Sequence, residues 1–245
     1  MPAIFSKPLH EITASDVQTL VDEEYPENAT VEFKEQLPNR DGEDPWYKGA
    51  GRISERARNS ILEEVIALAN TYGGHVLIGI SETDNKPSRA ASIKPIPRCA
   101  DLAEQLQLQL RDLVDPQIPL VRAIGVQTDG ESGVVVVRIP QSRLAPHRHT
   151  VTRECYYRHA DRTEKMTMRE IQDLTLRISH VLANIEATYK KRMEDARSKL
   201  NASSLVTIRA TLIPLSPLYA QEIRNSSQLF HSWFTCYLTI GSPIV

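Results

Sequence analysis

Apolar residues recur at spacings of three and four in several stretches of the chain, which is the pattern of helices with one buried face. The predicted helices cover residues 12–22, 57–70, 99–113 and 167–182. Thr13 or Ser15 can cap the first helix, and Thr167 with Glu170 can cap the last. Gly73-Gly74 follows the second, so we expect that helix to end at a tight corner, because glycine takes the left-handed backbone cheaply.

Shorter apolar patterns predict strands. Residues 30–34 alternate, which puts Glu32 and Lys34 together on the face opposite Val31 and Phe33. A continuous apolar run, 75–80, predicts a buried strand. Further strands are expected over 120–127, 133–139 and 153–159, the first two as a hairpin. Together these elements predict an α+β fold, with a mixed sheet covered by the helices 57–70, 99–113 and 167–182.

Two stretches have no regular apolar pattern. Residues 37–51 are rich in Pro, Gly and Asp and predict a long exposed loop, whose Trp46 and Tyr47 either stack on a base or pack back on the domain. Residues 183–200 predict a charged helix, and charges almost vanish after Leu200. A poorly packed tail, a partner-docking segment and two further strands all stay open there. We therefore divide the chain into a domain over 1–182, with its core at about 20–175, and a segment 183–245.

The composition excludes several classes of protein. The net charge of −2 gives no bulk attraction to nucleic acid, so any such function must rest on a local patch. Cys99, Cys155 and Cys236 are far apart, which suits free thiols in a reducing cytosol and predicts a cytoplasmic protein. Before residue 200 no apolar run is long enough for a membrane span.

A local basic patch occurs between residues 143 and 165, where six Arg or Lys residues and three His residues stand against three carboxylates. Arginines and tyrosines in such a stretch can hold phosphates and stack on bases. The predicted nucleic-acid contacts are Arg143, His147, Arg148, Arg153, Tyr157, Arg158, Arg162 and Lys165. A solvated face with local ion pairs is the plain alternative. A nucleotide such as ATP is another, although neither GxxxxGK[ST] nor GxGxxG occurs in the chain.

Four blocks occur in a characteristic order: ENATVEFKE at 27–35, ANTYGGHVLIGISE at 69–82, RIPQSRLAPH at 138–147 and YYRHADRTEKMTMREI at 156–171. Together they resemble the Schlafen-type AlbA_2 domain over about residues 20–175. The resemblance implies a mixed α/β module associated with binding of DNA or ATP. Some Schlafens cleave transfer and ribosomal RNA with three acidic residues and a divalent metal.

Carried over to this chain, the resemblance implies catalytic roles for Glu27, Glu32, Lys34 and Glu82. The three glutamates would bind Mg²⁺ or Mn²⁺, hard ions that prefer oxygen ligands. The family usually shows two adjacent acids where this chain has Ser81-Glu82, so Asp84 is the fallback for the third position. From the residues alone, Glu32 and Lys34 fit equally well as an exposed ion pair on a half-buried strand.

Three hypotheses follow. The first is a nucleic-acid-binding protein that acts as a metal-dependent endoribonuclease on structured RNA. The second is a non-catalytic regulatory module that binds DNA or a nucleotide such as ATP. The third is a scaffold in which residues 183–200 form a homo-oligomer or bind a partner.

Overall fold

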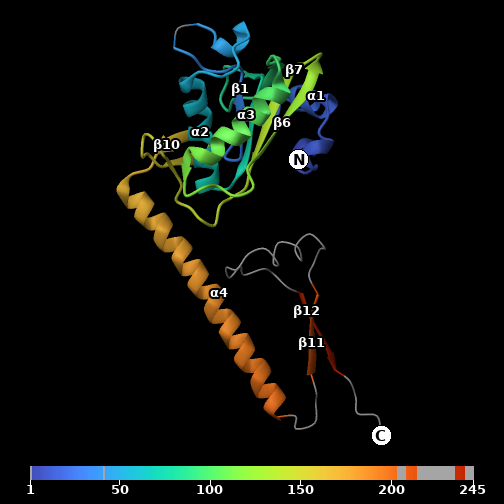
Figure 1. Cartoon of the computed structure of the whole chain (residues 1–245), viewed down its shortest axis with the longest axis vertical. Coiled ribbons are helices and arrows are strands. Elements are labelled where there is room, and N and C mark those ends of the chain that lie inside the picture. The colour runs from blue at the N-terminus through green and yellow to red at the C-terminus, as the bar shows by residue number, and fades with distance from the viewer. Residues whose placement is uncertain (1, 41, 203–207, 214–234, 241–245) are drawn as a thin grey trace. The chain divides into compact units, whose positions relative to one another are not determined.

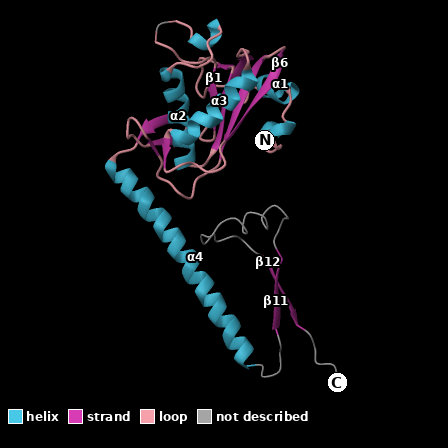
Figure 2. Ribbon diagram, in the orientation of Figure 1, coloured by secondary structure: helices cyan, strands magenta, loops and turns pink. Residues whose placement is uncertain are grey.

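A four-stranded sheet in the order β1-β2-β7-β6 forms the centre of the unit Met1–Val181 (Figures 1 and 2). The computed structural model describes residues 2–40, 42–202, 208–213 and 235–240 of the chain. The sheet contains β1 (Val31–Lys34), β2 (Gly74–Ile78), β7 (Ser132–Ile139) and β6 (Arg122–Asp129). β1 and β2 are parallel, whereas β7 is antiparallel to both of its neighbours. The predicted mixed sheet is therefore confirmed, including the β6–β7 hairpin.

Helices cover both faces of this sheet. One face packs against α2 (Glu55–Asn70) and α3 (Cys99–Asp112), and the other packs against α1 (Ala14–Asp22) with the short 3-10 helices η1 (Ala3–Phe5) and η2 (Leu9–Glu11). Successive strand residues alternate between the two layers, so Val135 and Val137 face α2 and α3 while Val134 and Val136 face α1. The α+β class is confirmed.

The last long helix differs from the prediction. α4 (Met168–Ala202) is a single helix of 35 residues that joins the predicted helix 167–182 to the predicted charged helix 183–200 (Figure 1). Most of its described side chains are exposed, and it belongs to neither hydrophobic cluster. The expectation that residues 167–182 cover the sheet is therefore wrong. The third covering element is α1, which packs with η1 and η2 on the face opposite α2 and α3.

Short strand pairs surround the sheet. β3 (Ile80–Glu82) pairs with β4 (Ala90–Ile93), β5 (Val114–Asp115) pairs with β8 (Arg148–His149), and β9 (Tyr156–His159) pairs with β10 (Arg162–Lys165). The predicted strand 75–80 is thus divided between β2 and β3, because Gly79 takes a φ of 107° at the break. The predicted strand 153–159 is followed by β10, which the apolar pattern did not predict.

The unit Leu182–Val245 contains a further strand pair after α4. β11 (Ile208–Ile213) runs antiparallel to β12 (Thr235–Ile240), with Ile208 opposite Ile240. Of the three alternatives for the region after Leu200, two strands are therefore present, and the rest of that region lies outside the described residues. The predicted boundary between residues 182 and 183 falls inside α4. Among the residues described, no helix is long and apolar enough to cross a membrane.

A tight corner connects α2 to β2, as predicted. Gly73 and Gly74 have φ values of +70° and +149°, and the Gly73 N–H donates to the Leu68 carbonyl at 2.7 Å. This corner brings the start of β2 against the residue before β1, where the His75 N–H donates to the Thr30 carbonyl at 2.8 Å. A Cβ on Gly74 would lie 2.1 Å from that carbonyl oxygen. The parallel β1–β2 pair thus depends on glycine at position 74.

We predict that Gly74→Ala lowers the free energy of unfolding by about 2–4 kcal/mol, because the added methyl group must push the two strands apart. Urea denaturation followed by circular dichroism measures the change. Gly51→Ala is the matched control: a Cβ at Gly51 meets nothing within 4 Å, so its midpoint should stay near that of the wild type. Equal midpoints for both variants would contradict the assigned corner.

Candidate functional site: a buried cluster of carboxylates and an exposed hairpin

Three buried carboxylates surround the guanidinium group of Arg158. Arg158 Nη1 lies 2.5 Å from Glu32 Oε2 and 3.0 Å from Glu64 Oε2, and Nη2 lies 3.4 Å from Glu27 Oε1. The Arg158 side chain is only 1% exposed. Charges taken out of water are stable only when they are paired and hydrogen-bonded. The arginine and the carboxylates therefore hold each other in place.

Lys34 is the second cation of this cluster. Its Nζ lies 3.0 Å from Glu64 Oε1 and also pairs with Glu32 Oε1. β1 places Glu32 and Lys34 on the face away from Val31 and Phe33, as the alternating pattern predicts. The plain alternative of an exposed surface pair is wrong, because Glu32 is 6% exposed and sits between two cations.

Glu82 reaches the same region through the topology of the sheet. β1 and β2 are parallel neighbours, so residues that follow β2 emerge at the edge where Lys34 ends β1. Glu82 lies on β3, which begins directly after the Gly79 break. Its charge raises the pKa of Glu27, and the charge of Glu32 raises the pKa of Glu82. We call Glu27, Glu32, Glu64 and Glu82 the acidic cluster. The four predicted catalytic residues thus lie within or beside one cluster.

The protonation states in the acidic cluster are strongly perturbed. Burial raises the pKa of Glu27 to about 9, with further contributions from its hydrogen bond to Glu32 and from the Glu32 charge. Burial opposes ionisation of Glu32 as well, but the hydrogen bond from Glu27 and the charges of Lys34 and Arg158 together hold its pKa below the ordinary value. Glu27 therefore keeps its proton at neutral pH and shares it with Glu32. Burial and the Glu32 charge also raise the pKa of Glu82.

Sequence reasoning missed Glu64 and the inward position of Arg158. Glu64 lies on α2 and is 9% exposed, and it also accepts a hydrogen bond from Thr163 Oγ1 on β10. A usable signal existed: Glu63 and Glu64 interrupt an otherwise apolar helical run, so one of them had to face inward. The partner of that inward carboxylate has no comparable signal in the sequence.

The implied divalent metal does not fit this arrangement of side chains. Both oxygens of Glu32 and both oxygens of Glu64 already contact Lys34 or Arg158. Among the residues that the structure describes, no group of three or more His, Cys, Asp or Glu side chains is placed to hold a metal ion. The cations of the protein itself hold the positions between the carboxylates.

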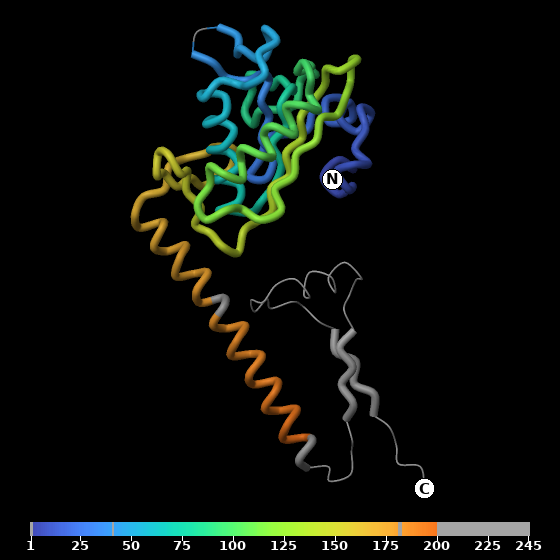
Figure 3. The backbone as a smooth tube through the Cα atoms, in the orientation of Figure 1, coloured from blue at the N-terminus to red at the C-terminus, as the bar shows by residue number. Residues whose placement is uncertain are grey.

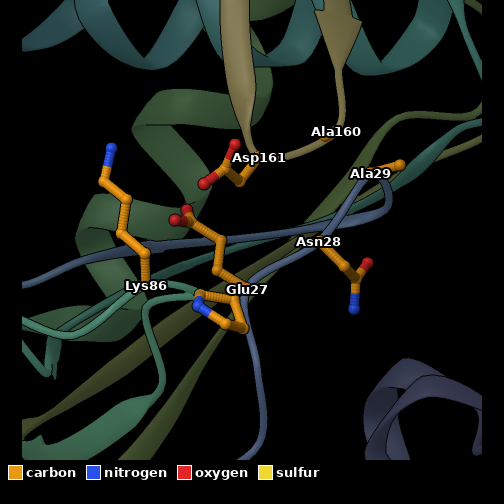
Figure 4. Close-up of a pocket in the computed structure, with 7 residues that line it drawn as sticks. Glu27, Asn28, Ala29, Lys86, Ala160 and Asp161 are labelled. Carbon is orange, nitrogen blue, oxygen red and sulfur yellow. The ribbon is translucent and has the colours of Figure 1, made fainter.

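A pocket of about 430 Å³ opens beside the acidic cluster (Figure 4). It is lined by Glu27, Asn28, Ala29, Lys86, Pro87, Ala160 and Asp161. The carboxylates of Glu27 and Asp161 point toward one another, with Lys86 to one side. Because Glu27 keeps its proton at neutral pH, the charges of Asp161 and Lys86 cancel and the pocket lining has no surplus positive charge for a triphosphate. This pocket therefore does not suit the phosphates of ATP.

Several predicted nucleic-acid contacts are not at the surface. His147 is fully buried, its Nδ1 lies 2.5 Å from the Pro116 carbonyl oxygen, and its backbone N–H donates to Asn70. Arg158 is buried in the acidic cluster. Arg148 is exposed, but its Nε and Nη2 both contact Asp115, at 3.0 and 2.8 Å. Buried side chains cannot touch a ligand without a rearrangement, so the predicted set does not form one surface.

Two of the predicted contacts, Tyr157 and Arg162, lie on the outward face of the β9–β10 hairpin. Arg158 faces inward, and its neighbours Tyr157 and His159 therefore face outward. Arg162, opposite His159, and Glu164, opposite Tyr157, face the same way, and Glu164 accepts from the Tyr157 hydroxyl at 3.2 Å. The rings of Tyr157 and His159 lie 6.2 Å apart. His159 and Arg162 are exposed, and Tyr157 is half-buried. His159 joins this surface although it was not among the predicted contacts.

The other predicted basic contacts flank the hairpin. Arg153 and Arg143 are exposed in the loops before it, and Lys165 at its end pairs with Glu154 at 3.2 Å. Trp46 and Tyr47 do not extend this surface. Trp46 is 2% exposed and donates to the Pro97 carbonyl at 2.7 Å, and the Tyr47 hydroxyl accepts from the Leu37 N–H at 3.1 Å. Of their two open alternatives, packing back on the domain is correct.

Comparison with known proteins places the chain in a family. The model of the family described as Schlafen, AlbA_2 matches residues 27–167. Among solved structures, the DIP2311 protein from Corynebacterium diphtheriae is similar, with 19% identity and a TM-score of 0.38, over 61% of this chain and only 29% of that one. The N-terminal domain of a RecG-related protein from Nitrosomonas europaea is similar with 19% identity and a TM-score of 0.35, over 54% of this chain and 74% of that one. No curated protein matches the chain.

The proton on Glu27 generates a prediction about pH. The pKa of Glu27 rises from 4.5 to about 9 on folding, so its contribution to stability is complete below its unfolded pKa and is lost as the pH rises toward 9. Glu27→Gln is neutral at every pH. We therefore expect the stability of this variant, relative to the wild type, to increase by about 1–3 kcal/mol between pH 5 and pH 9 in urea titrations. Glu24→Gln, at an exposed position, is the control. A pH-independent difference for Glu27→Gln would mean that Glu27 is ionised.

Arg158 generates a second prediction. Arg158→Leu leaves the buried carboxylates of Glu32 and Glu64 without one of their two cations, and we expect the free energy of unfolding to fall by about 3–5 kcal/mol. The exposed Arg169 offers the matched control, Arg169→Leu, with a change near zero. A double-mutant cycle with Glu64→Gln should give a coupling of about 1–3 kcal/mol. Strict additivity of the two changes would refute the ion pair.

Proposed function

The chain belongs to the Schlafen AlbA_2 family, and from this premise we propose that it is a nucleic-acid-binding domain whose contact surface is the outward face of the β9–β10 hairpin. The observation that carries the proposal is the grouping of Tyr157, His159 and Arg162 on that face. Each has a role in binding: the rings stack on bases, and the guanidinium group contacts a phosphate. The family association with nucleic acid supports the same conclusion.

The ligand we propose is a nucleic acid with unpaired bases, such as the loop of a structured RNA. Aromatic side chains stack on bases only when those bases are splayed out of a helix, and most sequence-tolerant binders of single strands combine such rings with cations. The inward face of the hairpin supports this role. Arg158 joins the hairpin to β1 and α2, so the outward side chains are held on a fixed platform and lose little freedom on binding.

The metal-dependent endoribonuclease is less well supported than binding alone. Glu27, Glu32 and Glu82 are the ligands that the family implies, but Lys34 and Arg158 compete for the carboxylates of this cluster. Nucleotide binding also has little support, because the pocket beside Glu27 has no surplus positive charge for phosphates. A homo-oligomer through residues 183–200 and a cytoplasmic location stay predictions.

We predict that Tyr157→Ala weakens binding of a labelled 20-nucleotide single-stranded RNA about 5- to 100-fold in fluorescence anisotropy, since a stacked base is worth about 1–3 kcal/mol. Tyr157→Phe keeps the ring and should bind like the wild type. Arg162→Gln should reduce the slope of log affinity against log salt concentration by about 1, the value of one lost phosphate contact.

Two outcomes would contradict the proposal. One is a wild-type protein that binds no RNA or DNA at low salt, and the other is equal binding by Tyr157→Ala and the wild type. The same RNA is also incubated with Mn²⁺ or with EDTA. Cleavage that requires Mn²⁺ and disappears in Glu32→Gln would establish the nuclease in place of the pure binding module.

A further inference from the structure

A second group of exposed cations lies where the long loop enters α2. Between Pro45 and Arg58 the chain has four cations and one carboxylate, Glu55, which pairs with Arg58 at 3.3 Å. The remaining cations are Lys48, Arg52 and Arg56, and all three are exposed. Within the described part of the chain none of them has an ion pair. We call these three residues the basic loop surface.

The backbone that carries the basic loop surface is held in place although it has almost no regular structure. Arg98 Nη2 donates to the carbonyls of Trp46 and Ala50 at 2.9 and 2.8 Å, and its guanidinium carbon lies 4.0 Å from the centre of the Trp46 ring. The buried carboxylate of Asp44 accepts from the N–H groups of Trp46 and Ser54 at 2.9 and 3.0 Å.

Gln105 adds two further contacts to the same backbone. Its Nε2 donates to the Gly51 carbonyl at 2.8 Å, and its Oε1 accepts from the Ile53 N–H at 3.3 Å. These side chains thus fix a loop whose three exposed cations have no hydrogen bond or ion pair with any described residue. Cations on a fixed backbone lose less conformational entropy when they bind than cations on a mobile one.

The loop that carries the basic loop surface leads into α2, the helix that contacts the hairpin. It joins β1 to α2, the two elements that hold Lys34 and Glu64, and α2 also packs against the β9–β10 hairpin (Figures 1 and 3). Arg56 precedes Glu64 by eight residues on α2, which is a rise of about 12 Å along the helix axis. The positive end of the α2 dipole adds to the field of the three cations. The basic loop surface thus lies toward the N-terminal end of the helix that contacts the hairpin.

We propose that Lys48, Arg52 and Arg56 form a second contact surface for the same nucleic acid, which binds successive phosphates of a strand whose bases stack on the hairpin. This inference rests on the proposed function. The three charges belong to a 3-10 helix, a loop and the start of α2, and separate cations can each neutralise a different phosphate of one strand. Binding here is independent of sequence, because phosphate contacts position a strand and carry no base information.

The test compares two triple variants that remove the same charge. Lys48→Gln/Arg52→Gln/Arg56→Gln neutralises the basic loop surface, and Lys94→Gln/Arg111→Gln/Arg122→Gln neutralises three exposed cations on other elements. The probes are labelled single-stranded RNAs of 20 and of 4 nucleotides. We expect the loop variant to bind the 20-mer at least about tenfold more weakly at 0.15 M salt, with a salt dependence shallower by about 2, while the control variant binds like the wild type.

The short probe and the hairpin variant separate the possible failures. The 4-mer reaches only the hairpin, so the loop variant should bind it like the wild type, whereas Tyr157→Ala should not. Equal affinity of both triple variants for the 20-mer, with Tyr157→Ala still defective, overturns the second surface and leaves the proposed function standing. A wild-type protein that binds neither RNA overturns both. Equal urea midpoints for the two triple variants and the wild type exclude misfolding as the cause.

Discussion

The buried guanidinium group of Arg158 joins three parts of the chain that are distant in sequence. It contacts Glu32 on β1, Glu64 on α2 and Glu27 in the segment before β1, so the β9–β10 hairpin, the sheet and a helix share one charged centre. The stability of such a centre depends on complete pairing, because each buried ion loses its hydration. Arg158 and Lys34 balance the charges of Glu32 and Glu64, and the proton on Glu27 removes the charge of the third carboxyl group. The hairpin presents its outward residues only because its inward residue is anchored in this way.

The pairing also bears on what the acidic cluster does. A cluster of carboxylates can hold a divalent metal ion, but here the cations of the protein contact the carboxylate oxygens. The outward face of the hairpin is separate from that cluster, and Arg158 connects the two. In the proposed function the hairpin therefore needs the acidic cluster as a support, whereas a metal would need Arg158 and Lys34 to leave it.

Local patterns predicted the elements better than their contacts. The period of two at residues 31–34 correctly placed Glu32 and Lys34 on one face, and the Gly73-Gly74 pair marked the corner between α2 and β2. The hydrogen bonds of Arg158 to Glu64 and Glu27 span 94 and 131 residues, and no periodicity within one element reports such a contact. β10 was missed because its residues, RTEK, have no apolar alternation. The sequence predicted α4 as two helices, and its apolar periodicity wrongly indicated that the first of them packs on the sheet.

The same arginine has an effect on the edge of the sheet. β1 is an edge strand, and its open side exposes backbone groups that another extended chain can pair with. Arg158 Nη2 donates to the carbonyls of Asn28 and Val31, both at 3.3 Å, so the side chain that balances the acidic cluster also occupies acceptors along that edge. The carbonyl of Val31 thus has its hydrogen bond within the molecule, which leaves one acceptor fewer at the edge of β1 for another extended chain.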